Sequence, residues 1–336
     1  MTTSIPKTGR RIVVTPENRV EVREFPLNPP GPGAVLIETA CTLISAGTEL
    51  GNQEQRRDRD YTPGYSNAGR IIAVGEGVQD YRIGDRVLSL GEHATHVVSS
   101  VVPQRLRPIP DRVSDEEAAF GVLGSVAMHG VRKARIELGE YVLITGMGLV
   151  GQLALRLAAG TGAEGLIAAD LVDERLKKAK EGGATHTFNP KEVDLKSGVE
   201  QATGGRWLDV TVEASGYPDA LPTIFDLSRI GGRVVLLGSI WRRKVEIDFM
   251  DFHLKELVLM GCHQPKCPIH PTGLFPWTQQ YNRGQILTMI ADGRLDVKGL
   301  ISHRLPGVEA GEAYRLLRDE RDRALGVILN WPQLSR

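Results

Sequence analysis

The chain has 336 residues, with 41 Lys or Arg against 41 Asp or Glu, so its formal net charge at pH 7 is zero. This balance argues against a surface that binds nucleic acid or acidic membranes, and we expect neither partner. With 41% hydrophobic residues the chain can bury a sizeable core, and its length predicts one large domain or two ordinary ones. Three cysteines make no disulfide framework, the N-terminal MTTSIPKTGRR has no apolar signal segment, and no apolar run reaches membrane-span length, so we expect a cytoplasmic protein.

Residues 1 to about 120 alternate short apolar runs with turn signals, which predicts a β-rich region. The prolines and glycines of Pro29–Gly33 and the pairs around Gly75 and Gly84 mark loops and turns. This pattern is typical of a small closed or partly closed sheet. The predicted strands are Arg11–Thr15, Ala34–Ala40, Gly69–Val74, Arg86–Leu90 and Ala94–Val98.

From about residue 121 strand and helix signals alternate. Six strands with helical crossovers predict a doubly wound parallel sheet, an α/β fold. Helices are expected at Val150–Ala159 and Asp173–Glu181. The predicted strands are Tyr141–Thr145, Gly165–Asp170, Thr185–Phe188, Trp207–Glu213, Arg233–Leu237 and Leu257–Gly261.

The last stretch, from about residue 265 to 336, does not continue this alternation. A proline-rich loop, Pro265–Pro276, leads into helices predicted at Gln285–Ala291 and Glu309–Arg318 and a strand at Leu325–Asn330. Because this stretch is too short for a domain, we expect it to complete the N-terminal one. Residues 1–122 and 265–336 then form one discontinuous domain, and residues 123–264 form the other.

The most informative motif is a glycine turn between a predicted strand and a predicted helix. Its glycines have the spacing Gly-x-Gly-x-x-Gly, and a carboxylate, Asp170, stands 19 residues beyond the third one. Gly146 allows the tight turn, Gly148 lets a pyrophosphate approach the backbone, and Gly151 lets helix and strand pack closely. The helix start offers N–H groups and a positive dipole end to phosphates. We therefore predict a dinucleotide site at Gly146, Met147, Gly148, Leu149, Val150 and Gly151.

Asp170 decides which dinucleotide we expect. A carboxylate at this position accepts hydrogen bonds from the adenosine ribose hydroxyls and repels a 2′-phosphate, so the sequence favours NAD over NADP. Leu171 follows it, where an NADP enzyme usually has a small polar or basic residue, and Arg175 is close enough in sequence to reach the ribose. Gly238 and Ser239 follow a predicted strand and are expected at the nicotinamide end.

Taken together, a series of landmarks resembles the medium-chain dehydrogenase/reductase superfamily of alcohol and polyol dehydrogenases. The resemblance implies a chaperonin-10-like β-rich catalytic domain built from both chain ends, an inserted Rossmann domain and an active site in the cleft between them. It also implies a homodimer formed by the edge strands of two Rossmann sheets. The landmarks are Val35–Ile37, Gly64–Val74, Gly84–Val87, His93–Val98, Ile109–Asp111, Gly146–Gly151, Asp209–Gly216, Gly231–Ser239, Lys255–Leu257, Gly293–Val297 and His303.

The chain departs from this family where zinc members hold their catalytic metal. The segment Ile44–Glu49 has no thiol, and the family's Gly-His-Glu is replaced by Gly64–Ser66. The three ligand positions fall at Ser45, Tyr65 and Val122, which make no normal zinc ligand set. The four-cysteine lobe of the structural zinc is absent too, so we predict no metal. The Ser-x-Gly-Thr-Glu segment resembles a zinc-free branch with bacteriochlorophyllide-type and sugar- or cyclitol-type members.

Without zinc, side chains must move the proton that accompanies hydride transfer. His93 is the first candidate because an imidazole titrates near neutrality, although it also suits a turn residue that caps the pocket. Tyr65 either donates to a carbonyl oxygen or fills the metal's volume. Glu49 and Thr48 lie on the loop of the family's proton relay, and Glu49 alternatively pairs with an Arg. Substrate contacts are expected from Ser45, Asn67, His263 and Gln264.

The sequence thus predicts an NAD-dependent, zinc-independent dehydrogenase that interconverts a secondary alcohol and its ketone on a small molecule, a sugar, cyclitol or other polyhydroxy compound. A zinc-free quinone or enone reductase is the alternative enzyme, but that branch usually prefers NADPH and has Ala in place of Gly146. A catalytically silent dinucleotide-binding protein is the alternative without an enzyme activity.

Overall fold

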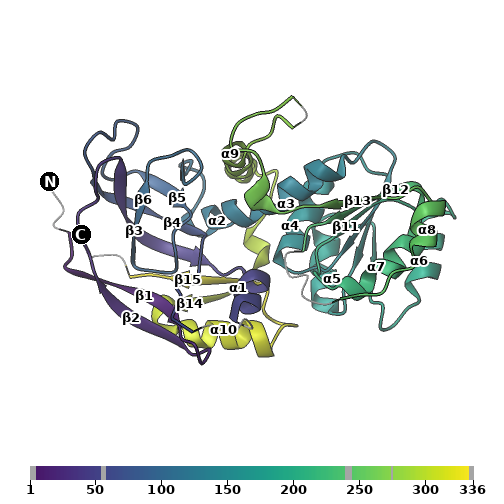
Figure 1. Ribbon diagram of the computed structural model, residues 1–336, viewed down its shortest axis with the longest axis horizontal. Helices are drawn as coiled ribbons and strands as arrows, with labels where there is room; N and C mark the ends of the chain where they lie inside the picture. The colour runs from purple at the N-terminus through teal and green to yellow at the C-terminus, as the bar shows by residue number, and fades with distance from the viewer. Residues whose placement is uncertain (1–4, 54–57, 239–243, 274, 333–336) are drawn as a thin grey trace. The chain divides into compact units, whose positions relative to one another are not determined.

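The computed structural model describes residues 5–53, 58–238, 244–273 and 275–332 (Figure 1). Their backbone divides into two compact units, Met1–Val122 together with Pro268–Arg336, and Leu123–Cys267. Among these residues no helix is both long and apolar enough to cross a lipid bilayer.

The first unit is built on a seven-stranded sheet with the order β14-β15-β3-β4-β5-β7, in which β6 also pairs with β3. A two-stranded ribbon, β1 with β2, adds to it. Because β15 pairs antiparallel with β3, a strand from the end of the chain joins the N-terminal strands in one sheet. The strands are β1 (Thr8–Val14), β2 (Val20–Pro26), β3 (Ala34–Leu43), β4 (Asn67–Val74), β5 (Arg86–Ser89), β6 (His96–Ser100), β7 (Leu106–Pro108), β14 (Ile301–Pro306) and β15 (Gly326–Asn330).

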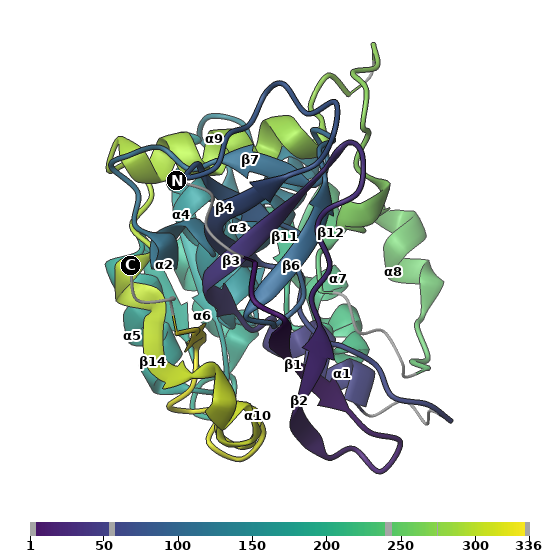
Figure 2. The same cartoon turned by 90° about the vertical axis from the view of Figure 1, so that its left-hand side faces the viewer.

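Helix α10 (Ala310–Asp319) covers part of this unit and packs against β2, β15 and helix α1 (Ala46–Gln53) (Figure 2). Its buried face contributes Tyr314 and Leu317 to a core that also holds Ile12 and Ile44. Helices α2 (Asp115–Ala118) and α9 (Gln279–Ala291) complete the unit. Residues from both ends of the chain therefore share one hydrophobic core.

Helix α1 corrects the predicted loop around Thr48 and Glu49. The backbone N–H of Glu49 donates to the Ser45 carbonyl at 2.9 Å, while the Glu49 carboxylate accepts from the Ser45 N–H at 2.8 Å. This reciprocal pair closes the first turn. Glycines at positions 47 and 51 hid the helix from a reading of the sequence.

The second unit contains a six-stranded parallel sheet with the order β10-β9-β8-β11-β12-β13, which confirms the predicted doubly wound fold. The chain moves outward from β8 to one edge, then returns and continues from β11 to the other. Ligands of such sheets bind at the carboxyl ends of the strands where the order reverses, here between β8 and β11. The strands are β8 (Tyr141–Thr145), β9 (Gly165–Ala169), β10 (His186–Phe188), β11 (Leu208–Glu213), β12 (Ser228–Leu236) and β13 (Val258–Gly261).

Short helices connect these strands and bury apolar side chains against them. One cluster joins Leu143 and Ile167 of the sheet to Val199 of a connecting helix. The helices are α3 (Gly121–Ala134), α4 (Leu149–Ala158), α5 (Asp173–Glu181), α6 (Leu195–Thr203), α7 (Leu221–Leu227) and α8 (Phe249–Leu254). The sheet interior is consequently apolar, and polar side chains gather at the strand ends.

We predict that His129 on α3 makes the fold sensitive to acid. Burial, with Lys133 and Arg132 nearby, lowers the pKa of His129 from 6.5 to about 4. Between these two values the unfolded chain binds a proton that the folded chain does not, so stability falls as the pH is lowered from 6.5 to about 4. Urea unfolding of His129→Gln at both pH values should show a smaller loss than the parent protein.

The exposed His186 provides the matched control, since His186→Gln should keep the parent's acid sensitivity. An acid-induced loss of stability that is the same in His129→Gln and in the parent would contradict the assignment.

Candidate active site

Two glycines of the turn after β8 are required by the fold itself. Gly146 has φ +81°, and a Cβ there would lie 2.5 Å from the backbone of Ser215. A Cβ on Gly151 would lie 1.9 Å from the Gly146 carbonyl oxygen. Gly148 differs, because its φ is −66° and a Cβ on it would meet nothing within 4 Å. The fold does not need a glycine at position 148, whereas a ligand that approaches the backbone does.

The start of α4 is open to such a ligand. Gly148 is the N-cap and supplies no side-chain hydrogen bond to the first turn. The N–H groups there and the positive end of the helix dipole are suited to a phosphate.

Asp170 stands at the rim of this turn, directly after β9. One carboxylate oxygen accepts from the N–H of Met147 at 2.6 Å and the other from the N–H of Val172 at 2.9 Å. Each oxygen keeps a lone pair for a further donor, such as a ribose hydroxyl. Arg175 lies with its Nη1 3.9 Å from the same carboxylate, and Gln152 donates to the Arg175 carbonyl at 2.7 Å. The structure therefore brings the predicted glycine turn, Asp170 and Arg175 together.

A buried carboxylate that sequence reasoning missed, Glu213, organises the neighbouring turns. Its side chain accepts from the N–H groups of Ser215 at 2.8 Å and Gly216 at 3.0 Å, and from the Thr145 hydroxyl at 3.3 Å. Burial raises the pKa of Glu213. The N–H of Gly238 reaches the Glu213 carbonyl at 2.8 Å, so the turns after β8, β11 and β12 meet here. An acidic residue at the carboxyl end of the buried strand β11 was the available signal. Of the two residues predicted at the nicotinamide end, Ser239 lies outside the described residues.

The β-rich unit holds a second polar cluster around Glu49, a side chain that is 2% exposed. One carboxylate oxygen accepts from the Ser45 N–H, and the other lies 3.0 Å from Nε2 of His93. The second oxygen also accepts from the hydroxyl of Tyr314. The carboxylate thus has three donors and no Lys or Arg among the partners that the structure gives it.

Tyr65 lies against the same segment. Its hydroxyl donates to Oγ of Ser45 at 2.5 Å and lies 3.5 Å from Oγ1 of Thr48. Burial raises the pKa of Tyr65 above its ordinary range, so the phenol keeps its proton at neutral pH. Gly64, at φ +101°, lies so close to His93 that a Cβ on it would be 2.5 Å from the backbone nitrogen of His93. The predicted residues Ser45, Thr48, Glu49, Tyr65 and His93 therefore do come together.

His93 is fully buried and both of its ring nitrogens have partners. Nδ1 lies 2.7 Å from Oγ1 of Thr42, and Nε2 faces Glu49. This environment suits a role through Glu49 better than the predicted direct exchange of a proton with a substrate. Asn67 is also fully buried, and its amide nitrogen donates to Thr39 at 2.9 Å.

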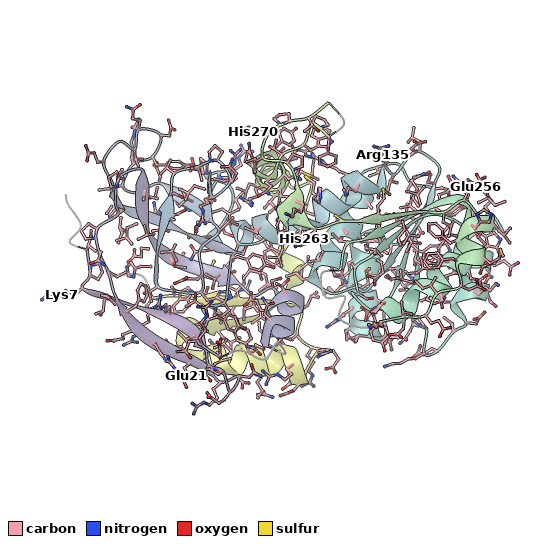
Figure 3. The ribbon with its side chains drawn as sticks, viewed as in Figure 1. Lys7, Glu21, Arg135, Glu256, His263 and His270 are labelled. Atoms are coloured by element: carbon pink, nitrogen blue, oxygen red, sulfur yellow. The ribbon has the colours of Figure 1, made fainter. Side chains whose placement is uncertain are left out.

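The remaining pocket candidates belong to the other unit. His263 and Gln264 follow β13, where Gln264 opens a short 3-10 helix (Figure 3). Burial raises the pKa of the neighbouring Cys262 thiol to about 12, which disfavours the thiolate that binds metals. Within the described part of the chain, no three His, Cys, Asp or Glu side chains are grouped so that they could hold a metal ion.

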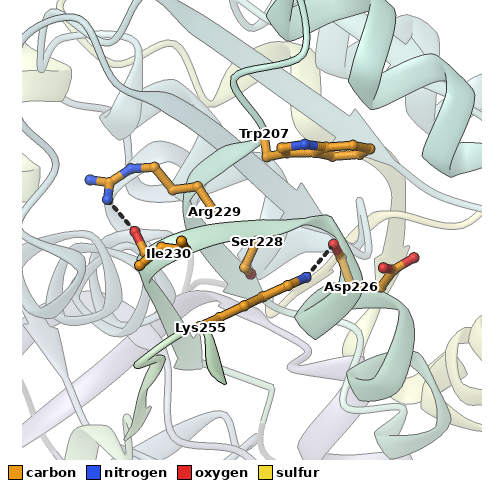
Figure 4. Close-up of a pocket in the computed structure, with 6 residues that line it drawn as sticks. All are labelled: Trp207, Asp226, Ser228, Arg229, Ile230 and Lys255. Atoms are coloured by element: carbon orange, nitrogen blue, oxygen red, sulfur yellow. Dashed lines mark hydrogen bonds between the residues drawn. The ribbon is translucent and has the colours of Figure 1, made fainter. Parts of the chain in front are cut away.

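An open hollow of about 510 Å³ lies at the opposite end of the parallel sheet, where Trp207 precedes β11 and Ser228 begins β12 (Figure 4). Its charged groups have partners of their own. Lys255 donates to the carbonyls of Phe225 and Asp226, and Arg229 pairs with Asp209. Because dinucleotides bind at the carboxyl ends of such strands, this hollow is not the cofactor site.

The proteins that this chain resembles are dehydrogenases. Residues 150–273 match a family model described as "Zinc-binding dehydrogenase". Sorbitol dehydrogenase of Bacillus subtilis is 26% identical over 337 aligned positions, which cover 90% of this chain and 91% of the relative. (R,R)-Butanediol dehydrogenase of the same organism is 30% identical over 225 positions, 60% of this chain and 64% of the relative.

Solved structures show the same fold over nearly the whole chain. The crystal structure of 2R,3R-butanediol dehydrogenase from Bacillus subtilis has a TM-score of 0.82 and 20% identity, and the match covers 97% of this chain and 100% of that one. The likeness confirms the predicted combination of a Rossmann domain with a chaperonin-10-like domain.

We predict that Gly148→Ala separates cofactor binding from folding. Overpacking against a bound pyrophosphate costs about 1–3 kcal/mol, so the Kd for NAD should rise by about fivefold to 150-fold while the thermal unfolding midpoint stays near that of the parent. Calorimetric titration and thermal denaturation measure the two effects.

Gly31→Ala is the matched control, since a Cβ there also meets nothing within 4 Å, and NAD binding should not change. Unaltered NAD affinity in Gly148→Ala would place the pyrophosphate elsewhere.

Proposed function

We propose that this chain, a medium-chain alcohol dehydrogenase/reductase, uses NAD to interconvert a secondary alcohol and its ketone on a polyhydroxy compound, without zinc. One observation carries the proposal. Ser45 and Tyr65, which the sequence resemblance assigns to two metal-ligand positions of the zinc members, are hydrogen-bonded to each other through their hydroxyl groups at 2.5 Å.

The chemistry of these side chains does not fit a zinc ion. Zinc binds thiolate, imidazole and carboxylate, whereas Ser45 and Tyr65 offer neutral hydroxyls and Val122 offers no donor atom. Burial disfavours the Tyr65 phenolate. Glu49 and His93 are directed to each other and to Ser45, Tyr314 and Thr42. The family match, which begins at residue 150, does not include Ser45 or Tyr65.

In the proposed mechanism hydroxyl groups take over the handling of the substrate oxygen. The glycine turn and Asp170 would hold NAD, which would supply the hydride acceptor for alcohol oxidation and, in its reduced form, the hydride donor for ketone reduction. Tyr65 turns its O–H from Ser45 to the substrate oxygen and, in ketone reduction, donates a hydrogen bond that stabilises the developing alkoxide, which takes its proton from water. Ser45 then donates its own O–H to Tyr65, with Thr48 as a second hydroxyl neighbour.

The cofactor and substrate class rest on separate observations. The Asp170 carboxylate beside the glycine turn favours a free ribose over a 2′-phosphate and therefore supports NAD. The relatives named for sorbitol and butanediol support a substrate with several hydroxyl groups. His263, Gln264 and Asn67 remain proposed substrate contacts.

We also propose a cytoplasmic homodimer. The edge strand β13 exposes Val258 and Leu259, by 46% and 38%, which suits pairing with the same strand of a second copy. Three buried cysteines that form no disulfide fit a reducing compartment.

Replacement of the phenol tests the proposed chemistry. Tyr65→Phe removes the hydrogen-bond donor to the alkoxide that forms in the transition state of either direction, so kcat for polyol oxidation with NAD should fall about 100-fold or more while the Kd for NAD is unchanged. Steady-state kinetics on a panel of sugars, cyclitols and diols measures the effect.

Tyr81→Phe is the control, because burial also raises the pKa of that phenol and it lies in the same unit away from Ser45. Full activity of Tyr65→Phe would refute the role of Tyr65. Turnover of quinones or enones with NADPH, but not of alcohols, would favour the alternative reductase, and nucleotide binding without any turnover would favour a silent binding protein.

A second variant tests the choice of cofactor. Asp170→Asn keeps an amide oxygen for the Met147 N–H but loses the charge that binds the ribose and repels a 2′-phosphate. A hydrogen bond to a charged group contributes about 1.5–3 kcal/mol, so the preference for NAD over NADP should narrow about tenfold or more. Competitive titration with both nucleotides gives this ratio.

Glu164→Gln, which removes an exposed carboxylate just before the amino end of β9, should leave the ratio unchanged. Preference of the parent protein for NADP would overturn the assignment to NAD.

A further inference from the structure

Five buried polar side chains form one continuous hydrogen-bonded chain, which reaches Ser45 through Glu49. Trp331 Nε1 donates to Oγ1 of Thr42 at 3.2 Å, and the same oxygen lies 2.7 Å from Nδ1 of His93. His93 Nε2 lies 3.0 Å from Glu49, which also accepts from the hydroxyl of Tyr314. None of the five is more than 3% exposed, so water does not compete for these bonds.

Hydrogen-bond chemistry permits one consistent arrangement of the protons. A carboxylate only accepts, so Nε2 of His93 must carry its hydrogen toward Glu49. The Trp331 indole only donates, so it occupies one lone pair of the Thr42 oxygen. The Thr42 hydroxyl hydrogen then has the Nδ1 lone pair of His93 as its acceptor. A hydrogen on Nδ1 would instead leave the Thr42 hydroxyl without an acceptor among the described residues.

We propose that this hydrogen-bonded chain is a positioning device. It holds His93 in the neutral Nε2–H tautomer and keeps Glu49 a carboxylate that accepts from three donors. It thereby keeps Ser45 within hydrogen-bond distance of the Tyr65 hydroxyl. The inference deepens the proposed function and rests on it for the role of Tyr65. Thr42, Tyr314 and Trp331 become positioning residues for the reaction, although none of them lies at the Tyr65 hydroxyl.

The burial of the Glu49 charge explains why each hydrogen bond of the chain is needed. Among the described residues Glu49 has no Lys or Arg partner, and a buried carboxylate in that situation is costly unless its lone pairs meet hydrogen-bond donors. Ser45 supplies one of these donors through its backbone N–H, so the position of Ser45 is coupled to the other donors of Glu49. Tyr314 and Trp331 come from the C-terminal part of the chain, which makes that part necessary for the geometry of the hydroxyl pair.

Variants of Thr42 test the device through kinetics. Thr42→Val keeps the volume but removes the donor to His93, whereas Thr42→Ser restores it. Because small misplacements of reacting groups lower rates steeply, kcat of Thr42→Val should fall about tenfold or more with the KM for NAD unchanged, and Thr42→Ser should retain parental kcat. Thr15→Val removes another buried hydroxyl of the same unit, one that contacts Glu17, and should leave kcat unchanged.

Nitrogen NMR of the His93 ring tests the device without any turnover. We expect the parent and Thr42→Ser to show a single Nε2–H tautomer, and Thr42→Val to show loss of that fixed state. A mixture of tautomers in the parent, or the same kcat in Thr42→Val and Thr42→Ser, would overturn the proposal. If the parent oxidises no alcohol, the proposed function fails, while the NMR result still decides whether the tautomer is locked.

Discussion

The structure of the β-rich unit depends on one constraint, a buried carboxylate whose partners among the described residues include no Lys or Arg. Glu49 is held by the Ser45 N–H, by His93 and by Tyr314. Such a group tolerates neither the loss of a donor nor a shift of the segments that carry them. It therefore couples helix α1, the His93 turn and helix α10 into one rigid support. The hydroxyl groups of Ser45 and Tyr65 stand on this support.

The feature that matters in the parallel-sheet unit is the start of helix α4, where no side chain caps the backbone N–H groups of the first turn. Gly146 and Gly151 allow the tight turn after β8, and a Cβ on Gly148 would meet no atom within 4 Å. Asp170 accepts a hydrogen bond from the Met147 N–H of this turn. Glu213 ties the adjoining turns together from beneath. In the proposed function one unit would offer a nucleotide its phosphate and ribose contacts, and the other would offer hydroxyl groups to a substrate oxygen.

The sequence predicted what depends on local pattern. Strand and helix alternation gave the parallel sheet, and the glycine spacing gave the turn with Asp170 beside it. Helix α1 was missed because Gly47 and Gly51 interrupt the pattern of helix-forming residues. The sequence also contained no sign that His93 is completely buried. Tyr314 and Trp331 could not have been found, because 265 and 289 residues separate them from Glu49 and Thr42. Contacts so distant in sequence follow from the fold and not from any local signal.

Metal dependence tests the central claim most directly. The purified enzyme should be dialysed against a strong chelator, analysed for zinc and assayed with NAD and its best polyol, with and without added zinc. We expect no stoichiometric zinc and full activity after dialysis, because the proposed mechanism uses neutral hydroxyl groups at the substrate oxygen. One zinc per chain, with activity that is lost on chelation and restored by zinc, would contradict it.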